Sequence, residues 1–445
     1  MTVHDLVIVG GGPAGVATAY RLRDSGLSVK VLEEQPEPGG RTKSVRLPGG
    51  MANTGALFAY RGTPSEELVA ELGLDAVPFE PTTYGISVDG CTSIGTSNTD
   101  VVKALPLPAD DRGALLATLD RAVAEYRDNT RGGRFTANAH HLAGETVAQR
   151  FRSLPTRARE VLETAVRGGS VGDTEHLSAH YALRYFASYP AHEKESRLVV
   201  LKGMQALTTG MAARLAPGTL ELSTQVTKVT FDATTGVHTV SATGPAGDVE
   251  HRARQVLLAV PAPLVASLVG DLPTWKREAL VRAETPGSTT MVVAVDVHGV
   301  EHHRDWAFVT TVGSRFDCII NPAPGRSTSS DEPNIVHFVC YGNSAGYRPD
   351  LPDDEEQQAE WLADFLTVAP GLRGRVLATH VQTWEHCFAL LSPARAAVVD
   401  DLRRSVGAMH FAGDWTSPSA GTHGALGEAE RVAVAVLATA GITAR

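Results

Sequence analysis

The chain has 445 residues, of which 43% are hydrophobic and 20% charged, and its formal net charge is −10 at pH 7. This length exceeds what one core usually supports, so we expect at least two domains. The acidic balance argues against a nucleic-acid partner, and no apolar run reaches the ~20 residues of a membrane-spanning helix. The four cysteines are far apart in the sequence, which favours free thiols and a cytoplasmic location.

A glycine-rich motif follows the first predicted strand. Residues 5–9, Asp-Leu-Val-Ile-Val, form the apolar run expected of a strand buried in a parallel sheet. The motif at residues 10–15, Gly-Gly-Gly-Pro-Ala-Gly, comes next, and residues 14–25 have a helical pattern. A second strand over residues 28–32 ends at Glu33. This order of strand, glycine loop, helix, strand and acid predicts a Rossmann unit that binds the ADP half of a dinucleotide.

Each position in this unit has a physical task. Gly10 permits the tight turn, Gly12 lets the backbone approach the pyrophosphate, and Gly15 allows close packing of helix on strand. The helix N-terminus presents free N–H groups to the phosphates. Glu33 can accept hydrogen bonds from the ribose hydroxyls. The other residues of this unit expected at the cofactor are Pro13, Ala14 and Glu34.

Later segments carry a more specific signal. Gly39-Gly40-Arg41 follows Glu33 closely, and residues 410–415 form an apolar strand that ends in Gly-Asp-Trp, shortly before a predicted last helix. This order of motifs resembles the flavin amine oxidase superfamily, which includes monoamine and amino-acid oxidases, protoporphyrinogen oxidase and the phytoene-type desaturases. Four further stretches resemble it in the expected order: residues 49–56, 201–207, 220–229 and 255–261.

The resemblance implies non-covalently bound FAD as the cofactor. Gly39 and Gly40 would let backbone lie against the phosphate and ribityl chain, where Arg41 offers charge-assisted hydrogen bonds. The helix from about His423 would point its N-terminus at the pyrimidine end of the flavin, where its dipole stabilises negative charge. The remaining residues expected at the cofactor are Gly55, Ala56, Val226, Gly413, Asp414, Gly421, Thr422, His423 and Ala425.

The implied fold class is α/β: a Rossmann-type FAD-binding domain built from discontinuous segments, with an inserted α+β substrate domain of a mixed sheet plus helices. We expect the FAD-binding domain to comprise residues 1–60, 199–270 and 395–445. The substrate-binding domain would comprise residues 61–198 and 271–394.

The inserted material has its own secondary-structure signals. Helical patterns cover residues 110–126, 146–168 and 353–367, and β-branched runs cover residues 289–297 and 334–341. Strands and helices of this kind fit a sheet with a helical cap. Residues 322–333, rich in Pro, Gly and Ser, predict a loop near the substrate entrance.

Two positions depart from the amine oxidases of the superfamily. These enzymes generally hold a lysine against the flavin, on the strand that here reads Gly-Ser-Thr-Thr-Met-Val-Val over residues 287–293, and Thr289 or Thr290 stands in its place. Thr422 occupies the position where these oxidases often have an aromatic residue. Both departures favour a dehydrogenase or desaturase that takes a hydride from an activated C–H bond of a small organic metabolite, giving a C=C or C=N product.

The catalytic candidates are His423 and Thr422. An imidazole with an ordinary pKa near ~6.5 suits proton removal, although a histidine at a helix start can equally face solvent. Cys387 lies where some relatives tether FAD covalently, but its surroundings fit the non-covalent branch. His298, His302, His303 and Asp305 match no known metal pattern, so we expect no metal.

Two other reactions stay open. An amine or amino-acid oxidase would form peroxide and use a cationic anchor such as Arg184 or Arg348. An isomerase or cyclase would need reduced FAD and take up no oxygen.

Overall fold

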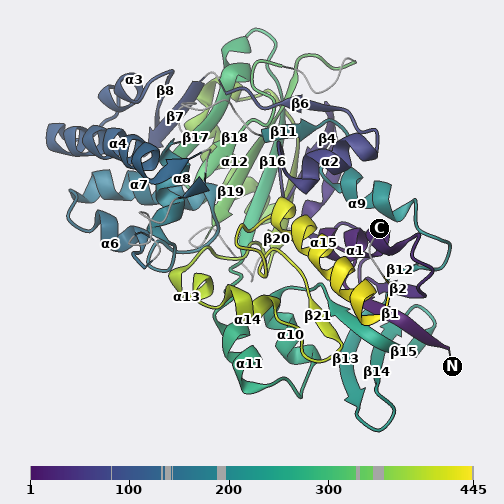
Figure 1. Ribbon diagram of the computed structural model, residues 1–445. Helices are drawn as coiled ribbons and strands as arrows, with labels where there is room; N and C mark the ends of the chain where they lie inside the picture. The colour runs from purple at the N-terminus through teal and green to yellow at the C-terminus, as the bar shows by residue number, and fades with distance from the viewer. Residues whose placement is uncertain are drawn as a thin grey trace.

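The computed structural model describes residues 2–81, 83–131, 134–135, 142, 144–187, 197–326, 331–343 and 355–442. Two seven-stranded sheets form the body of the molecule, and helices cover them (Figure 1). The α/β fold class predicted from the sequence is confirmed. Within the described residues, no helix is long and apolar enough to cross a membrane.

The first sheet has the strand order β12-β2-β1-β15-β14-β13, and β21 pairs with β15. Its centre is β1, which runs parallel to β2 and β15, and its buried residues Leu6, Val7 and Ile8 are fully inaccessible. The strands are β1 (Val3–Val9), β2 (Val29–Leu32), β12 (Leu220–Glu221), β13 (Gln225–Asp232), β14 (Val237–Gly244), β15 (Gly247–Leu258) and β21 (Met409–Phe411). Helices α1 (Pro13–Leu22) and α15 (Thr422–Thr439) pack together beside this sheet (Figure 1).

The second sheet has the order β20-β16-β19-β18-β17-β7-β8 and is mixed, because β17 and β7 are parallel whereas the other pairs are antiparallel. Its strands are β7 (Thr83–Val88), β8 (Cys91–Gly95), β16 (Ser288–Asp296), β17 (Trp306–Val312), β18 (Cys318–Ile320), β19 (Ile335–Asn343) and β20 (Val376–Trp384).

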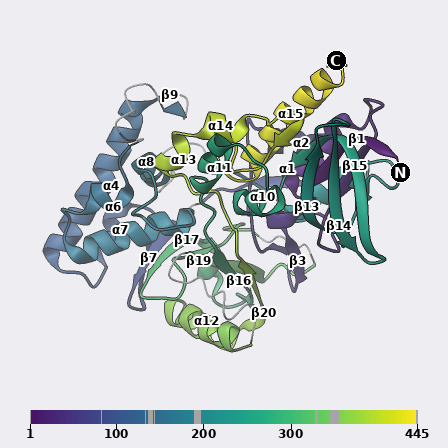
Figure 2. The same cartoon turned by 90° about the horizontal axis from the view of Figure 1, so that it is seen from below.

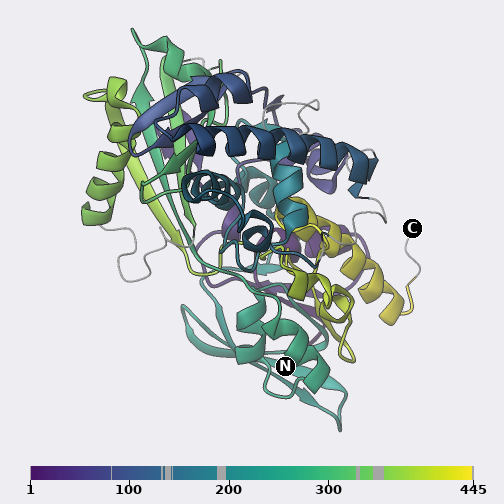
Figure 3. The same ribbon diagram turned by 90° about the vertical axis from the view of Figure 1, so that its left-hand side faces the viewer.

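Different helices cover the two faces of the second sheet. Helix α12 (Glu355–Val368) buries Trp361 and Phe365 against one face, and Figure 2 shows it beside β16 and β20. The other face, at its β7 and β17 end, is covered by a group of helices that Figure 3 shows from the outer side. These helices are α3 (Asn98–Lys103), α4 (Ala109–Asn129), α6 (Val147–Phe151), α7 (Thr156–Gly169) and α8 (Ala179–Ala187).

The prediction of a single helix over residues 146–168 is wrong. Residues 146–168 form two helices, α6 and α7, because Pro155 interrupts the pattern. Proline has no N–H to donate and disfavours helical backbone in the residue before it. In the structure Pro155 is the N-cap of α7, and Thr146 and Gln149 form a capping box on α6. The other predicted helices and strands of the inserted material are confirmed, with ends shifted by a few residues.

Short elements connect the two sheets. The hairpin β3 (Ser44–Leu47) and β4 (Gly50–Asn53) is one, and a three-stranded sheet of β5 (Ala59–Tyr60), β11 (Arg197–Val200) and β6 (Ala76–Pro78) is another. The remaining strands are β9 (Thr130–Arg131) and β10 (Arg134–Phe135). The remaining α-helices are α2 (Pro64–Glu71), α9 (Gln205–Ala212), α10 (Ala262–Leu268), α11 (Thr274–Val281), α13 (Pro393–Ala396) and α14 (Val399–Arg403). The residue ranges of the two domains stay a prediction.

Candidate cofactor and active site

The glycine loop between β1 and α1 contains two kinds of glycine. A Cβ atom at Gly15 would lie 2.0 Å from the carbonyl oxygen of Gly10, so only glycine lets the helix approach the strand. Gly10 itself has a φ of +104°. Gly12 differs, because its φ is −76° and a Cβ there would meet no atom of the described chain within 4 Å. Protein packing therefore does not explain the glycine at position 12, whereas a ligand lying against the backbone does.

Glu33 closes the side of this loop. Its side chain is buried, with Oε2 accepting from the Gly11 N–H at 2.5 Å and Oε1 accepting from the Gln35 N–H at 2.9 Å. Burial raises the pKa of this carboxyl, and the two N–H donors act in the opposite direction. Glu34, by contrast, is exposed and accepts from Gln225 Nε2 at 3.4 Å. Val226 follows Gln225 on β13 and is half-buried.

We expect Glu33→Ala to weaken FAD binding by roughly 1–3 kcal/mol, the usual loss when a charged hydrogen-bond acceptor is removed. Titration of the apoprotein with FAD measures this change. The control is Glu37→Ala, which removes an exposed carboxylate from the same stretch of chain and should leave the dissociation constant unchanged. Equal affinities for the two variants would mean that Glu33 does not hold the ribose.

The Gly-Gly-Arg segment lies against the glycine loop. The Gly39 N–H donates to the Gly11 carbonyl at 3.1 Å, and the position of a Cβ on Gly40 is 3.4 Å from the Cα of Gly12. Gly39 has a φ of +142° and Gly40 a φ of +49°, conformations that disfavour other residues. Two glycine segments thus meet with little side-chain bulk between them, around the open side of Gly12.

Arg41 and Asp414 form a bidentate ion pair. Nη2 of Arg41 donates to Oδ1 of Asp414 at 2.8 Å, and Nη1 donates to Oδ2 at 3.1 Å and to the Cys387 carbonyl at 2.9 Å. Asp414 Oδ2 also accepts from the Ala389 N–H at 2.9 Å, and its side chain is 4% exposed. The two residues expected to contact the phosphates and ribityl chain therefore also bind each other.

Sequence reasoning missed Arg395, which holds the Gly-Asp loop in place. Its side chain is 2% exposed and donates to the carbonyls of Asp414, Trp415 and Ser417. A buried arginine on three carbonyls ties the loop together, and one of them, that of Asp414, also accepts from the Ser417 N–H at 3.3 Å. Gly413 is also constrained, since a Cβ there would lie 2.7 Å from Nε1 of Trp415. No motif around Arg395 indicates this role.

The N-terminal end of α15 begins between the two sheets and runs outward beside α1 (Figure 1). Its N-cap is Gly421, with a φ of +87° and no side chain to cap the first N–H groups. Those groups are available to an acceptor, and that the acceptor is the flavin stays a prediction. Thr422 and His423 open the helix and are half-buried, and the His423 ring lies 4.8 Å from the ring of Tyr60. Ala425, one turn on, is buried.

One face of the second sheet is turned toward this region. Tyr341 Oη donates to the Gly55 carbonyl at 2.5 Å, and Trp384 Nε1 donates to the Thr54 carbonyl at 2.9 Å. Gly55 is closely packed, because a Cβ there would lie 2.1 Å from the Arg41 carbonyl. The next residue, Ala56, donates its N–H to the same carbonyl at 2.9 Å.

The sheet register decides between the two threonines. Thr290 pairs with Tyr341 and Gln382, so its side chain is on the face that meets the cofactor segments. Thr289 is on the opposite face and lies 3.2 Å from the Thr383 hydroxyl. Thr290 is fully buried, and its hydroxyl has no hydrogen-bond partner within the described part of the chain. Of the two threonines, Thr290 is therefore the one on the face toward the cofactor segments, and its correspondence to the lysine position stays a prediction.

Several other candidates can be placed. Burial raises the pKa of the Cys387 thiol to about 11, and the nearby Arg41 acts in the opposite direction.

In the described residues, no group of three or more His, Cys, Asp or Glu side chains could hold a metal ion. The side chain of Arg184 and the whole of Arg348 lie outside the described residues.

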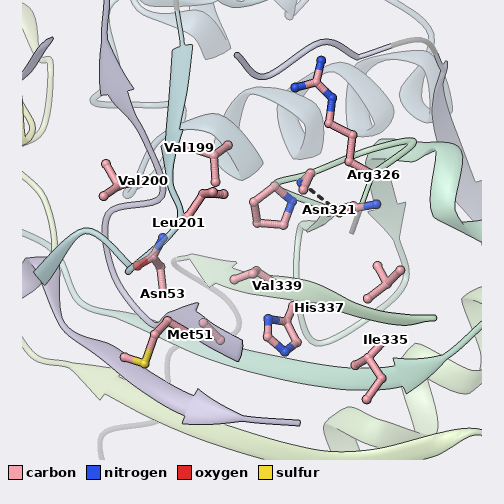
Figure 4. Close-up of a pocket in the computed structure, with 14 residues that line it drawn as sticks. Met51, Asn53, Val199, Val200, Leu201, Asn321, Arg326, Ile335, His337 and Val339 are labelled. Atoms are coloured by element: carbon pink, nitrogen blue, oxygen red, sulfur yellow. Dashed lines mark hydrogen bonds between the residues drawn. The ribbon is translucent and has the colours of Figure 1, made fainter. Parts of the chain in front are cut away.

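A cavity lies between β4, β11 and β19, where the connecting elements meet the second sheet (Figure 4). Figure 4 shows Met51, Asn53 and Leu201 on one side and His337 and Val339 on the other. Pro322, Ala323 and Arg326 also line the cavity. These three belong to the loop predicted near the substrate entrance, a role that stays a prediction.

Comparisons with known proteins give a consistent family. The family described as flavin containing amine oxidoreductase matches residues 13–437. Hydroxyneurosporene desaturase of Rhodobacter capsulatus is 40% identical over 74 residues, 14% of this chain and 15% of the relative. Putrescine oxidase of Kocuria rosea is 26% identical over 298 residues, 61% of this chain and 59% of the relative. The chain thus matches less than two thirds of the length of these relatives.

Solved structures show the same fold over almost the whole chain. Cyclohexylamine oxidase from Brevibacterium oxydans has a TM-score of 0.75 at 18% identity, covering 99% of this chain and 100% of that one. A protein described as putative protoporphyrinogen oxidase, from Exiguobacterium sp. 255-15, has a TM-score of 0.71 at 15% identity, with the same coverage. At these identities the likeness establishes the fold.

Proposed function

Because the chain belongs to the family of flavin-containing amine oxidoreductases, and is accordingly an FAD-dependent oxidoreductase, we propose that it takes a hydride from an activated C–H bond of a small organic metabolite. The product would have a new C=C or C=N bond. FAD, when bound, supplies the hydride acceptor, and the protein supplies binding, orientation and exclusion of water. The four cysteines are free thiols, one exposed, one half-buried and two buried, and they support the proposed cytoplasmic location.

The residues present fit FAD. The open side of Gly12, flanked by Gly40 and the N-terminus of α1, would hold the pyrophosphate. Glu33 would hold the ribose, and Arg41 with Asp414 would meet the ribityl side. The uncapped N-terminus of α15 would stabilise negative charge on the flavin ring. The domain assignments, Val226 and Glu34 near the adenine, and Thr422 and His423 as substrate-side residues belong to the same proposal.

The choice between an oxidase and a dehydrogenase rests on Thr290. A threonine hydroxyl at the lysine position removes a cation from the substrate side, so this site offers less electrostatic help to the reduction of oxygen. We therefore favour a dehydrogenase or desaturase that passes electrons to another acceptor. His423 would serve as the base where the substrate has a proton to lose.

The test starts with the purified protein, which should be yellow and release FAD on denaturation. Candidate metabolites are then added without air, and loss of the visible flavin absorbance identifies a substrate. A colourless protein that fails to take up added FAD contradicts the cofactor assignment. Oxygen uptake and peroxide formation with the substrate contradict the preference for a dehydrogenase.

An amine oxidase is the second candidate, favoured by the 26% identity to putrescine oxidase. The half-buried ring of Tyr60 beside His423 supports the amine-oxidase candidate, because an aromatic face attracts the cationic form of an amine. Bleaching by primary amines, with peroxide as the second product, would select this candidate over the first.

Thr290→Lys should accelerate the reoxidation of the reduced protein by oxygen at least about tenfold, because a nearby cation stabilises the negative charge that oxygen acquires. Photoreduced protein is mixed rapidly with aerated buffer, and the return of the flavin absorbance is followed. Thr290→Met, similar in length but uncharged, is the control and should stay slow. Fast reoxidation of the unmodified protein that persists in His423→Ala would show that position 290 does not govern the oxygen reaction.

A further inference from the structure

Asn343, the last residue of β19, is 2% exposed and uses its whole side-chain amide. Its Nδ2 donates to the carbonyls of Arg167 at 2.6 Å and Ser170 at 2.9 Å, and its Oδ1 accepts from Ser288 Oγ at 2.6 Å. Its backbone N–H donates to Oδ2 of Asp317 at 3.0 Å. Through its side-chain amide and its backbone N–H, Asn343 thus links β19 to three other segments, at residues 167–170, 288 and 317.

Two of these partners form the C-terminal end of α7. Asn343 donates to the carbonyl of Arg167, in the last turn of α7, which also accepts from the Ser170 N–H at 3.1 Å, and to the carbonyl of Ser170, the residue that follows the helix. Arg167 Nε also donates to Oδ1 of Asp317 at 3.0 Å. Cys318 Sγ donates to the Gly168 carbonyl at 3.2 Å, and a Cβ at Gly168 would lie 2.9 Å from the Cβ of Cys318. The end of α7 therefore rests directly on β18.

Ser288 lies between Asn343 and the segments of the cofactor site. It is the first residue of β16 and pairs with Asn343 on one side and Trp384 on the other. Its side chain also acts to lower the pKa of the Cys387 thiol. The carbonyl of Cys387 accepts from Arg41, the partner of Asp414. A few contacts thus separate the end of α7 from the ion pair at the cofactor site.

The end of α7 also holds α8. Tyr181 of α8 donates its hydroxyl to the Gly169 carbonyl, and a Cβ at Gly169 would lie 2.3 Å from the Tyr185 ring. The Tyr185 ring lies 5.8 Å from that of Phe308. Tyr181, Tyr185 and Tyr341 are half-buried and pack against one hydrophobic cluster, which makes them an aromatic wall. Tyr341 in turn binds the Gly55 carbonyl.

We propose that Asn343 is a positioning residue that holds the end of α7, and with it the aromatic wall, in place relative to the cofactor site. The proposal rests on the proposed function and adds to it that this aromatic wall contacts the substrate. A loosened wall weakens the binding of substrate and transition state alike, so it raises KM and leaves kcat nearly unchanged.

Thiol labelling of the FAD-loaded protein tests the docking of α7 without any substrate. Cys91 is exposed and Cys340, on the opposite face of the sheet near α12, is buried, so they serve as the reactive and protected references for Cys318. In Asn343→Asp and Asn343→Leu, N-ethylmaleimide should label Cys318 at least about tenfold faster, because two hydrogen bonds to α7 are lost. The control is Asn321→Leu, which removes an equally buried amide, bound to Arg304 and Ala323, from the same sheet.

Mass spectrometry of the labelled peptides separates the outcomes. Faster labelling of Cys318 alone supports the proposal. Unchanged labelling of Cys318 in both Asn343 variants overturns it, and so does equal acceleration at Cys340, which would indicate general loosening of the fold.

Kinetics with a substrate from the anaerobic screen supply the second measurement. Asn343→Asp should raise KM at least about fivefold and change kcat less than about twofold. A fall in kcat at constant KM overturns the positioning role. If α7 is released as expected but no compound reduces the flavin, the proposed function fails and the docking role of Asn343 stands.

Discussion

Replacing Gly12 with alanine should leave the apoprotein as stable as before and lower its affinity for FAD at least about a hundredfold. The backbone at Gly12 has an ordinary φ of −76°, and the added methyl group would meet no atom of the described chain within 4 Å. The same methyl group projects into the space that we assign to the pyrophosphate, where it would hold the cofactor away from the N–H groups of α1.

Gly15→Ala is the matched variant, one turn along the same helix. Its methyl group would overlap the Gly10 carbonyl at 2.0 Å, so α1 must move from β1 and the apoprotein itself should lose stability. Thermal unfolding of both apoproteins and titration with FAD distinguish a ligand effect from a packing effect. Wild-type affinity in Gly12→Ala would place the cofactor elsewhere.

Asp414→Ala should lower the free energy of unfolding of the apoprotein by about 3–5 kcal/mol, the range for removing one member of a buried ion pair. Within the described part of the chain, the substitution leaves the Cys387 carbonyl as the one hydrogen-bond acceptor of the Arg41 guanidinium, and it leaves the Ala389 N–H without its acceptor. Denaturant unfolding without FAD isolates this loss, because bound cofactor would add its own stabilisation.

Two comparisons make the Asp414 result specific. Arg254→Ala breaks an ion pair with Asp5 in which the Arg254 side chain is 65% exposed, and it should cost less than about 1 kcal/mol. The double variant Arg41→Met/Asp414→Leu should recover part of the loss, because no unpaired charge remains. A double variant as unstable as the sum of its two single variants would argue against a coupled pair.

The register of the second sheet shows where sequence reasoning stops. Thr289 and Thr290 are equivalent in a motif, yet successive side chains of a strand point to opposite faces. Only the pairing of β16 with β19 and β20 shows that Thr290 faces the cofactor segments and Thr289 faces away. A shift of one residue in that pairing would exchange them.

Distance along the chain limits inference in the same way. Arg41 and Asp414 are each recognisable in their motifs, but their mutual bond joins residues 373 positions apart. Arg395 and Asn343 belong to no motif, and they act on backbone carbonyls that only the folded chain brings to them.

The sequence by itself indicated the family, through a motif order that resembles it. It also predicted the Rossmann unit and the glycines of the cofactor loop, because these features follow from the local geometry of a strand, a turn and a helix N-terminus. It also determined most elements of the inserted domain, through hydrophobic periodicity, and failed over residues 146–168, where a proline interrupts that period. The tertiary structure alone decided which threonine faces the cofactor segments, which charges pair, and how α7 is held to the sheet. Those facts depend on contacts between distant segments, for which local sequence carries no signal.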